Sequence, residues 1–341
     1  MLVLPRSGLE GLRDLGFEEA SPAELCLDVV ARDRGTAEVT GARLALGTRV
    51  AVTALAGSSA QAETAIAAAF AELDRLSAVF SRYDPTTPLS LLNDAGHLEG
   101  PPPELIHVVA HAMALSAASG GAFDVTVKPV MDLLGSGTVA EDAKRRAVRL
   151  IGARRIAVDR RGIRFGRGGM GLTLDGIAKG YIVDRMADVL DRHGVVRFLI
   201  DGGGDIRVRG LNGRKRPWTI AVRDPRGGER HPEVIGLAAG AVATSGGYAR
   251  FLDGARTIPH IVTPATGDTP RAVASASVVA GDASTADALS TAVFVLGAHA
   301  GLSLIDALPG CAAFVLDAAG RAFRSNRWTA LAARSHEGPL A

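Results

Sequence analysis

The sequence predicts an α+β fold, and three observations support that class. Segments typical of strands and segments typical of amphipathic helices are interleaved, without the regular strand–helix–strand order of a doubly wound sheet. The chain has 341 residues, which is long enough for one large core or two fused lobes. No internal repeat of the period expected for a solenoid is visible.

Strands are predicted where apolar and polar residues alternate, or where a short apolar run lies between turn residues. The first predicted strand covers residues 44–53, ahead of a turn at Gly57. A short apolar run over 172–174 predicts another, which stops at the Asp175-Gly176 turn. The remaining predicted strands cover 156–159, 163–165, 195–200, 218–222, 241–248, 258–264, 274–279, 312–316 and 322–324.

Helices are predicted where apolar residues recur at spacings of three and four. Ile66, Phe70 and Leu73 begin such a series, which continues to Phe80. Other helices are predicted over 103–119, 140–151 and 284–297, and directly after the Asp175-Gly176 turn. Residues 1–43 are interpreted as an N-terminal extension of unknown role, with a short helix indicated by Leu9, Leu12 and Leu15.

Composition limits the classes of partner. The formal net charge is +2, so the overall field is too weak to predict nucleic acid or an acidic membrane as the main partner. Cys26 and Cys311 have no CxxC or zinc-type neighbour, so neither a disulfide framework nor a cysteine metal site is expected. The N-terminal residues contain no export-type apolar region and no apolar run could span a bilayer, so we expect a cytoplasmic protein.

The Asp175-Gly176 turn and the helix after it have the features of a phosphate-binding site. Lys179 falls in the first helical turn, where free backbone N–H groups and the positive end of the helix dipole favour anions. Gly176 and Gly180 leave room for a ligand close to the backbone. A solvated surface lysine is the simpler alternative, and the two glycines favour the binding role over it.

Residues 166–171 spell GxGxxG, the fingerprint of dinucleotide-binding folds. In those folds the motif opens a helix directly, whereas here residues 172–174 intervene. A flexible hairpin turn is therefore the favoured interpretation. A dinucleotide-dependent oxidoreductase is accordingly the least favoured function.

Two further groups of residues are candidates for chemistry. Asp287, Ser290 and Thr291 lie at i, i+3 and i+4 of a predicted helix, so their oxygens face one side. Such a set, with a single carboxylate, suits a hard cation such as Mg²⁺. On spacing alone, capping hydrogen bonds at a helix start are favoured over a metal site. His260 lies in an apolar predicted strand, where a packed histidine is more common than a catalytic base.

Taken together and in order, these segments resemble the FAD:protein FMN transferases, the ApbE-like flavin transferases. The resemblance covers about residues 44–325, so we assign a transferase domain to 44–330 and a C-terminal tail to 331–341. Any one of the matching blocks is weak, but the ordered set is specific. The blocks are 46–48, 80–83, 90–93, 122–127, 176–184, 202–206, 244–246, 260–267 and 286–292.

The resemblance implies a two-lobed, mixed-sheet (T-fold-like) architecture with an FAD site between the lobes. It also implies Mg²⁺-dependent cleavage of FAD, with FMN passing through a phosphoester to a Thr or Ser of an acceptor flavoprotein and AMP released. By resemblance, the carbonyl of Gly176 would bind Mg²⁺ together with Asp287, Ser290 and Thr291, and His260 would be the general base. The residues that would hold FAD are Leu46, Tyr83, Ala122, Phe123, Asp124, Thr173, Lys179 and Ile261.

The chain departs from the family pattern at three positions. Thr173 and Thr263 stand where relatives usually carry Asp, and Leu46 where they usually carry Met. An FAD pyrophosphatase, in which water replaces the protein hydroxyl, and a non-catalytic FAD-binding protein are therefore kept as alternatives. Many relatives are exported lipoproteins, and since the chain has neither an export signal nor a lipid-attachment cysteine, we expect a cytoplasmic acceptor.

Overall fold

The structure is a computed structural model, and it describes residues 25–33, 35–137, 139–227, 231–247, 251–252 and 258–336. The short helix predicted near Leu9 lies outside the described residues. No helix among those described is both long and apolar enough to cross a membrane.

The largest element of the fold is a nine-stranded sheet with the strand order β1-β2-β3-β7-β8-β11-β12-β13-β14. Every neighbouring pair in it is antiparallel, which is a more regular pairing than the mixed sheet we expected. The predicted α+β class is confirmed. The strands are β1 (Cys26–Asp33), β2 (Thr36–Ala45), β3 (Thr48–Ala56), β7 (Arg197–Asp201), β8 (Asp205–Arg209), β11 (Ala239–Gly246), β12 (Val273–Ala280), β13 (Ala312–Asp317) and β14 (Ala322–Arg324).

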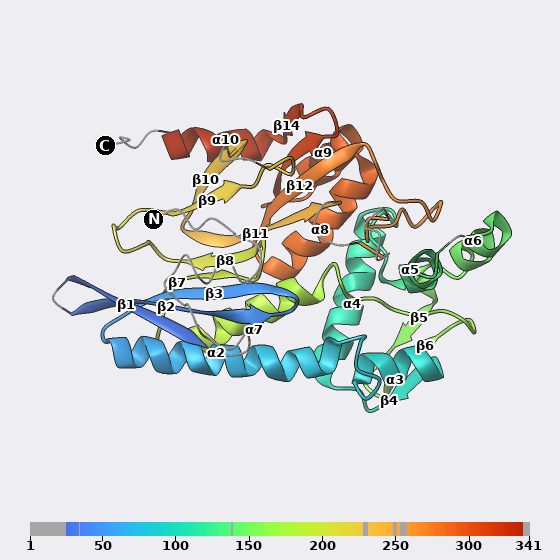
Figure 1. Cartoon of the computed structure of the whole chain (residues 1–341), viewed down its shortest axis with the longest axis horizontal. Coiled ribbons are helices and arrows are strands. Elements are labelled where there is room, and N and C mark those ends of the chain that lie inside the picture. Colours follow the sequence, from blue (N-terminus) through green and yellow to red (C-terminus); the bar gives the residue numbers. More distant parts are fainter. Residues whose placement is uncertain are drawn as a thin grey trace.

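Each face of this sheet has its own apolar core, because side chains alternate between the two faces along a strand. In β13, Ala313 and Val315 pack on one side, whereas Phe314 and Leu316 pack on the other. Helices α2 (Ser59–Phe80), α7 (Ala178–Arg192), α8 (Ala283–Leu296) and α9 (Ala298–Ala307) cover the first face (Figure 1). The second face is covered by α10 (Asn326–His336) and the hairpin of β9 (Trp218–Val222) and β10 (Glu233–Leu237).

A second, smaller lobe lies at one end of the sheet, on the right in Figure 1. Its three-stranded sheet has the order β4-β6-β5, and Val127, Val130, Met131 and Val262 belong to a small apolar cluster beside it. This arrangement fits the predicted two lobes. The elements are α3 (Pro88–Ala95), β4 (His97–Glu99), α4 (Pro103–Ala118), η1 (Val125–Val127), α5 (Lys128–Gly135), α6 (Glu141–Val148), η2 (Ala153–Arg155), β5 (Ile156–Val158) and β6 (Gly162–Phe165).

Three predicted strands differ from the structure. The segment 44–53 is a hairpin corner, with Leu46 (φ 53°) and Gly47 (φ 72°) turning the chain between β2 and β3. The predicted boundary at residue 43 therefore falls inside β2, and β1 and β2 extend the main sheet. Segments 172–174 and 258–264 are irregular, apart from a single bridge between Phe251 and Pro259. Both irregular segments turn out to line the candidate site.

Candidate active site

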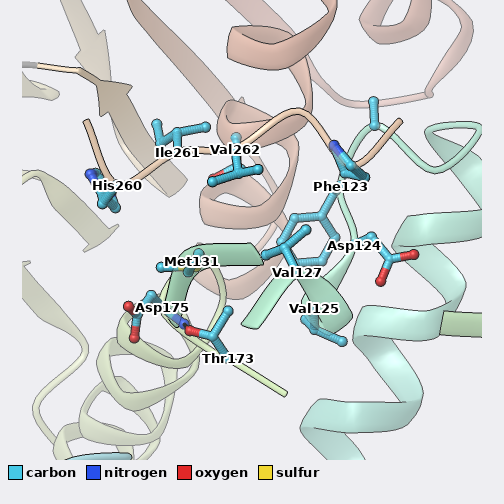
Figure 2. Close-up of a pocket in the computed structure, with 14 residues that line it drawn as sticks. Phe123, Asp124, Val125, Val127, Met131, Thr173, Asp175, His260, Ile261 and Val262 are labelled. Carbon is cyan, nitrogen blue, oxygen red and sulfur yellow. Dashed lines mark hydrogen bonds between the residues drawn. The ribbon is translucent and has the colours of Figure 1, made fainter. Parts of the chain in front are cut away.

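A pocket lies where the two lobes meet, and it collects residues from segments far apart in the sequence (Figure 2). The loop into η1 contributes one wall, the loop before α7 another, and the segment 260–264 a third. Thr291 of α8 completes it. Eight residues predicted to bind FAD or Mg²⁺, or to act as the base, line this pocket: Ala122, Phe123, Asp124, Thr173, Gly176, His260, Ile261 and Thr291.

The loop before α7 is irregular because its backbone groups bond to partners other than a neighbouring strand. The side-chain amide of Asn93 accepts from the Leu172 N–H at 2.6 Å and donates to the Leu172 carbonyl at 2.9 Å. The Thr173 N–H donates to the carbonyl of Val125 at 2.8 Å, which joins the loop to the smaller lobe. These bonds satisfy the backbone without a ladder and hold the loop against the pocket.

Close packing surrounds Gly176 and excludes any side chain at Gly180. A Cβ on Gly176 would lie 3.0 Å from the Thr291 hydroxyl oxygen and 3.3 Å from the Phe123 ring. A Cβ on Gly180 would lie 2.3 Å from the carbonyl oxygen of Ala283, so α7 and α8 approach each other more closely than any larger residue allows. The two glycines therefore bring the Gly176 backbone and the Thr291 side chain to the same place, as the predicted metal site requires.

The start of α8 is fixed against α7 by a carboxylate. Asp184 of α7 accepts hydrogen bonds from the N–H groups of Ala283 (2.8 Å) and Ser284 (2.9 Å), at the positive end of the α8 dipole. Asp282 caps the same helix by accepting from the Thr285 N–H at 2.7 Å. Asp184 thus sets the position of α8, and with it the position of Asp287.

Asp287 is 5% exposed, and the hydrogen bond it accepts from the Gly180 N–H is long, at 3.3 Å. Burial raises the pKa of Asp287 well above its ordinary value, the nearby Asp205 raises it further, and the Lys179 ammonium opposes both effects. The carboxylate is therefore only partly compensated by the protein. A buried acid in that condition is suited to receive a cation.

Two hydroxyls complete the oxygen set beside Asp287. Ser290 donates to the Asp287 carbonyl at 2.8 Å, and Thr291 does so at 3.3 Å. The hydroxyl of Ser245, on β11, lies 2.7 Å from that of Ser290 and 3.2 Å from that of Thr291. Among the described residues, no three His, Cys, Asp or Glu side chains lie close enough together to hold a metal. The donors are hydroxyl, carbonyl and one carboxylate, which fits Mg²⁺ in preference to zinc.

Lys179, which is predicted to bind FAD, is absent from the pocket lining and forms an ion pair. Its ammonium nitrogen lies 2.5 Å from a carboxylate oxygen of Asp205, which is 2% exposed. The turn before Asp205 is held by Asp201, which accepts from the N–H groups of Gly203 (2.9 Å) and Gly204 (3.0 Å). Asp205, Ser245 and Asp184 were not predicted as site residues. Each lies in a block that carries the family resemblance, but their partners are 26 to 100 residues away and cannot be read from spacing.

Besides Lys179, three predicted FAD contacts do not face the centre of the pocket. The Asp124 carboxylate points away from the centre of the pocket in Figure 2, and it accepts from the Thr126 hydroxyl (2.5 Å) and the Ala153 N–H (2.9 Å). Tyr83 is 69% exposed and is absent from the pocket lining, as is Leu46 at the β2–β3 corner. The GxGxxG run forms a turn after β6, and the next helix begins only at Ala178, so the hairpin-turn interpretation is confirmed.

Comparison with known proteins places this architecture in a family. A sequence profile of the ApbE family matches residues 46–315. The FAD:protein FMN transferase of Vibrio cholerae is 34% identical over 215 residues, which cover 60% of this chain and 64% of that protein. The protein of the same name from Haemophilus influenzae is 31% identical over 252 residues, covering 69% and 73%.

Comparison with solved structures also indicates the ApbE family. The ApbE protein of Thermotoga maritima matches with a TM-score of 0.79 at 29% identity, over 86% of this chain and 99% of that one. The flavinyl transferase ApbE of Pseudomonas stutzeri matches with a TM-score of 0.76 at 25% identity, over 91% and 98%. The chain therefore belongs to the ApbE family, and the predicted resemblance is confirmed.

Proposed function

We propose that this protein is an Mg²⁺-dependent FAD:protein FMN transferase. One observation carries the proposal: His260, Gly176 and Thr291 line one pocket, and Thr291 lies one helical turn from Asp287, which is buried and only partly compensated. The names of the relatives support the same activity. The substrate would be FAD, and the acceptor would be a flavoprotein with a Thr or Ser at the site of attachment.

The cation would be held by Asp287, Ser290, Thr291 and the carbonyl of Gly176. When bound, Mg²⁺ supplies positive charge that stabilises a pyrophosphate as negative charge develops on it. Ser245 would keep the two hydroxyls oriented, since its oxygen lies within hydrogen-bond distance of both. The N-terminal turn of α7 would add a second positive region for the phosphates. Lys179 would contribute to it only in part, because its ammonium is paired with the Asp205 carboxylate.

His260 would accept the proton of the acceptor hydroxyl. The hydroxyl oxygen forms a bond to the phosphorus of the FMN half of FAD, the bond from that phosphorus to the bridging oxygen breaks, and AMP leaves with that oxygen. A neutral imidazole can take the released proton at neutral pH. His260 lines the pocket together with Gly176 and Thr291, and this observation supports the proposed role.

The wall formed by Ala122, Phe123 and Ile261 would hold a ring of FAD. These side chains are buried and line the pocket, and the phenyl ring of Phe123 faces its centre in Figure 2. Asp124 would act mainly by holding the loop, because its carboxylate is already engaged by Thr126 and Ala153.

The test is incubation of the purified protein with FAD, Mg²⁺ and a candidate acceptor flavoprotein. We expect flavin fluorescence that stays on the denatured acceptor, with an equal amount of AMP released. AMP without a labelled acceptor would instead indicate an FAD pyrophosphatase. Tight FAD binding with no AMP under any divalent cation would contradict both activities and favour a flavin-binding protein.

A further inference from the structure

The smaller lobe carries the net positive charge of the chain, on a surface that the chemistry described above does not use. Residues 141–167 contain ten Lys or Arg and three Asp or Glu, which gives a formal charge of +7. The whole chain carries +2, so all the other residues together carry −5. The basic segment forms α6, η2, β5, β6 and their connections, on the right in Figure 1 and beyond the large sheet. The charge is therefore concentrated on one lobe.

Most of this charge is exposed and is not paired within the chain. Arg145 forms an ion pair with Asp142, but no Asp or Glu among the described residues forms one with the other exposed arginines of the segment. Asp159 instead accepts from the backbone N–H groups of Arg161 (2.7 Å) and Gly162 (3.0 Å), which fixes the hairpin turn. Unpaired guanidinium groups suit the carboxylates of a partner, which they bind through two parallel N–H donors. The exposed arginines are Arg145, Arg146, Arg149, Arg154, Arg160, Arg161, Arg164 and Arg167.

The outer face of the β4-β6-β5 sheet is hollowed into a groove of about 500 Å³. Arg164 lies on the middle strand, opposite His97 of β4 and Ala157 of β5, and all three are exposed. Two small residues, Ala157 and Gly162, leave space above the sheet, and Arg161 also lines the groove. The other face of this sheet packs into the main apolar core. The groove is thus an uncovered sheet face with two arginines in it.

The basic surface is the outer side of one wall of the candidate site. Ala147 of α6 packs in one apolar cluster with three residues that line the pocket, namely Val127, Met131 and Val262. Residues 166–171 lead from β6 into the loop before α7, which forms another wall. A protein attracted to the basic surface is therefore brought to the lobe that carries one side of the site.

We propose that this basic surface, formed by the eight exposed arginines and the groove over β4-β6-β5, docks an acidic surface of the acceptor flavoprotein. Arg161 and Arg164 bind an Asp or Glu side chain of that protein in the groove, and the remaining arginines steer its approach. The inference rests on the proposed function only in taking the acceptor flavoprotein as the partner.

Two features favour a protein over a lipid surface or a nucleic acid. None of the large apolar side chains exposed among the described residues lies within 141–167, so the surface has nothing to insert between lipids or to stack on bases. Glu99 and Asp159 line the same groove as the arginines. This mixture of signs suits a protein surface that carries both, and it repels a continuous row of phosphates.

The experiment measures binding of a fluorescent peptide of alternating Glu and Ser, by anisotropy and without FAD or Mg²⁺. The test variant is Arg161→Glu/Arg164→Glu. The control, Arg214→Glu/Arg216→Glu, makes the same change in net charge in the exposed loop between β8 and β9 of the larger lobe. We expect the test variant to bind the peptide about tenfold more weakly than wild type and the control to bind like wild type. High salt should reduce the difference, because the arginines are exposed.

A second measurement uses FAD, Mg²⁺ and a candidate acceptor flavoprotein. We expect the test variant to raise the KM for the acceptor about tenfold and to leave kcat unchanged, since the lost interaction is made before and during the reaction alike. The affinity for FAD, measured by flavin fluorescence, should stay at the wild-type value, because Arg161 and Arg164 do not line the pocket of the candidate site.

Three results would overturn the inference. They are equal losses of peptide affinity in the test and control variants, a loss of FAD affinity in the test variant, or binding of phosphatidylserine vesicles or single-stranded RNA, but not the peptide, through Arg161 and Arg164. If the test variant does not fold, Arg154→Glu/Arg160→Glu takes its place, because both side chains are exposed outside the strands. The peptide titration contains no FAD, so failure of the transferase proposal is detected separately, as absent AMP release by wild type.

Discussion

The two faces of the large sheet bury their carboxylates in different ways. Under α10, Glu233 is 7% exposed and accepts from Arg324 at 2.6 Å and from the Trp328 indole N–H at 3.4 Å. Under α8, Asp287 is 5% exposed and accepts from the Gly180 N–H at 3.3 Å, with Asp205 adding negative charge nearby. The negative charge of Glu233 is therefore balanced by neighbouring groups of the protein. The negative charge of Asp287 is balanced only in part.

This difference separates a structural acid from a functional one. Burying a charge costs free energy, and evolution usually offsets that cost with a partner in the same chain. Where the offset is incomplete, the fold carries a destabilising group that a ligand can stabilise. On that basis we assign Glu233 to the core around Trp328 and Phe314, and we propose Asp287 as a residue of the site.

The largest effect is expected from Asp287→Asn. We expect turnover to fall below detection and the rise in melting temperature on adding Mg²⁺ to disappear. Without Mg²⁺, the variant should melt at the same temperature as wild type or higher, because the uncompensated charge is gone while the side chain keeps its shape. Differential scanning calorimetry with and without Mg²⁺ measures this. A metal-free variant that melts well below wild type would show that Asp287 is a structural acid after all.

His260→Ala should have the next largest effect. Removal of a general base typically slows a reaction by about 10² to 10⁴-fold. We expect transfer to slow within that range while FAD still binds, since Phe123 and Ile261 remain to hold it. Stopped-flow kinetics and flavin fluorescence separate the two effects. Loss of FAD binding instead would make His260 a packing residue, the simpler interpretation that its sequence context favours.

On the opposite face, Glu233→Ala should act on stability alone. It leaves Arg324 and the buried Trp328 indole N–H without their acceptor, at an expected cost of about 3 kcal/mol in the free energy of unfolding. Urea denaturation measures the loss, and flavin transfer per folded molecule should match wild type. If the Glu233→Ala variant keeps its stability but loses flavin transfer, Glu233 is a functional residue and the proposed difference between the two faces is wrong.

Much of the fold was predictable because the signals are local. The short apolar run of β13 reflects a strand that is buried on both faces, and the three–four spacing of Ile66, Phe70 and Leu73 reflects a helix packed on one core. The loop at Leu172 was predicted as a strand because its side chains are apolar. The sequence pattern does not show that the Asn93 side chain forms hydrogen bonds with the backbone N–H and carbonyl of Leu172. Contacts with this residue, which is distant in the sequence, make the segment an irregular loop and not a strand.

The candidate site shows the same limit. The Asp287, Ser290 and Thr291 spacing is visible in the sequence, but capping was favoured because nothing local indicates that Asp287 is buried beside Asp205. The Lys179–Asp205 pair and the Ser245 hydroxyl arise from the packing of α7, β8 and β11. The ordered family blocks contained these residues, and only the structure assigned partners to them.

The smallest predicted effect concerns Asp184, which connects α7 to the start of α8. Burial raises the pKa of Asp184 to about 6, although the N–H groups of Ala283 and Ser284 lower it. Asp282 raises this pKa and Arg207 lowers it. Asp184 and His111 line a second pocket, separate from the candidate site. Because the folded pKa lies above the unfolded value, the contribution of this group to stability is fully present below about pH 4 and is lost as the pH rises through 6.

The side chain of the Asp184→Asn variant cannot titrate. Its free energy of unfolding relative to wild type should therefore increase by roughly 2 kcal/mol between pH 4 and pH 7. This figure takes 1.36 kcal/mol per pKa unit and is reduced to allow for the partial exposure of the side chain. Urea denaturation at pH 4, 5, 6 and 7 measures the difference. Asp191→Asn removes a charge from the same helix and serves as the control. If the stability difference between Asp184→Asn and wild type is the same at all four pH values, Asp184 stays ionised throughout. Its charge would then be stabilised by the α8 N-terminus, as the charge of Glu233 is by Arg324.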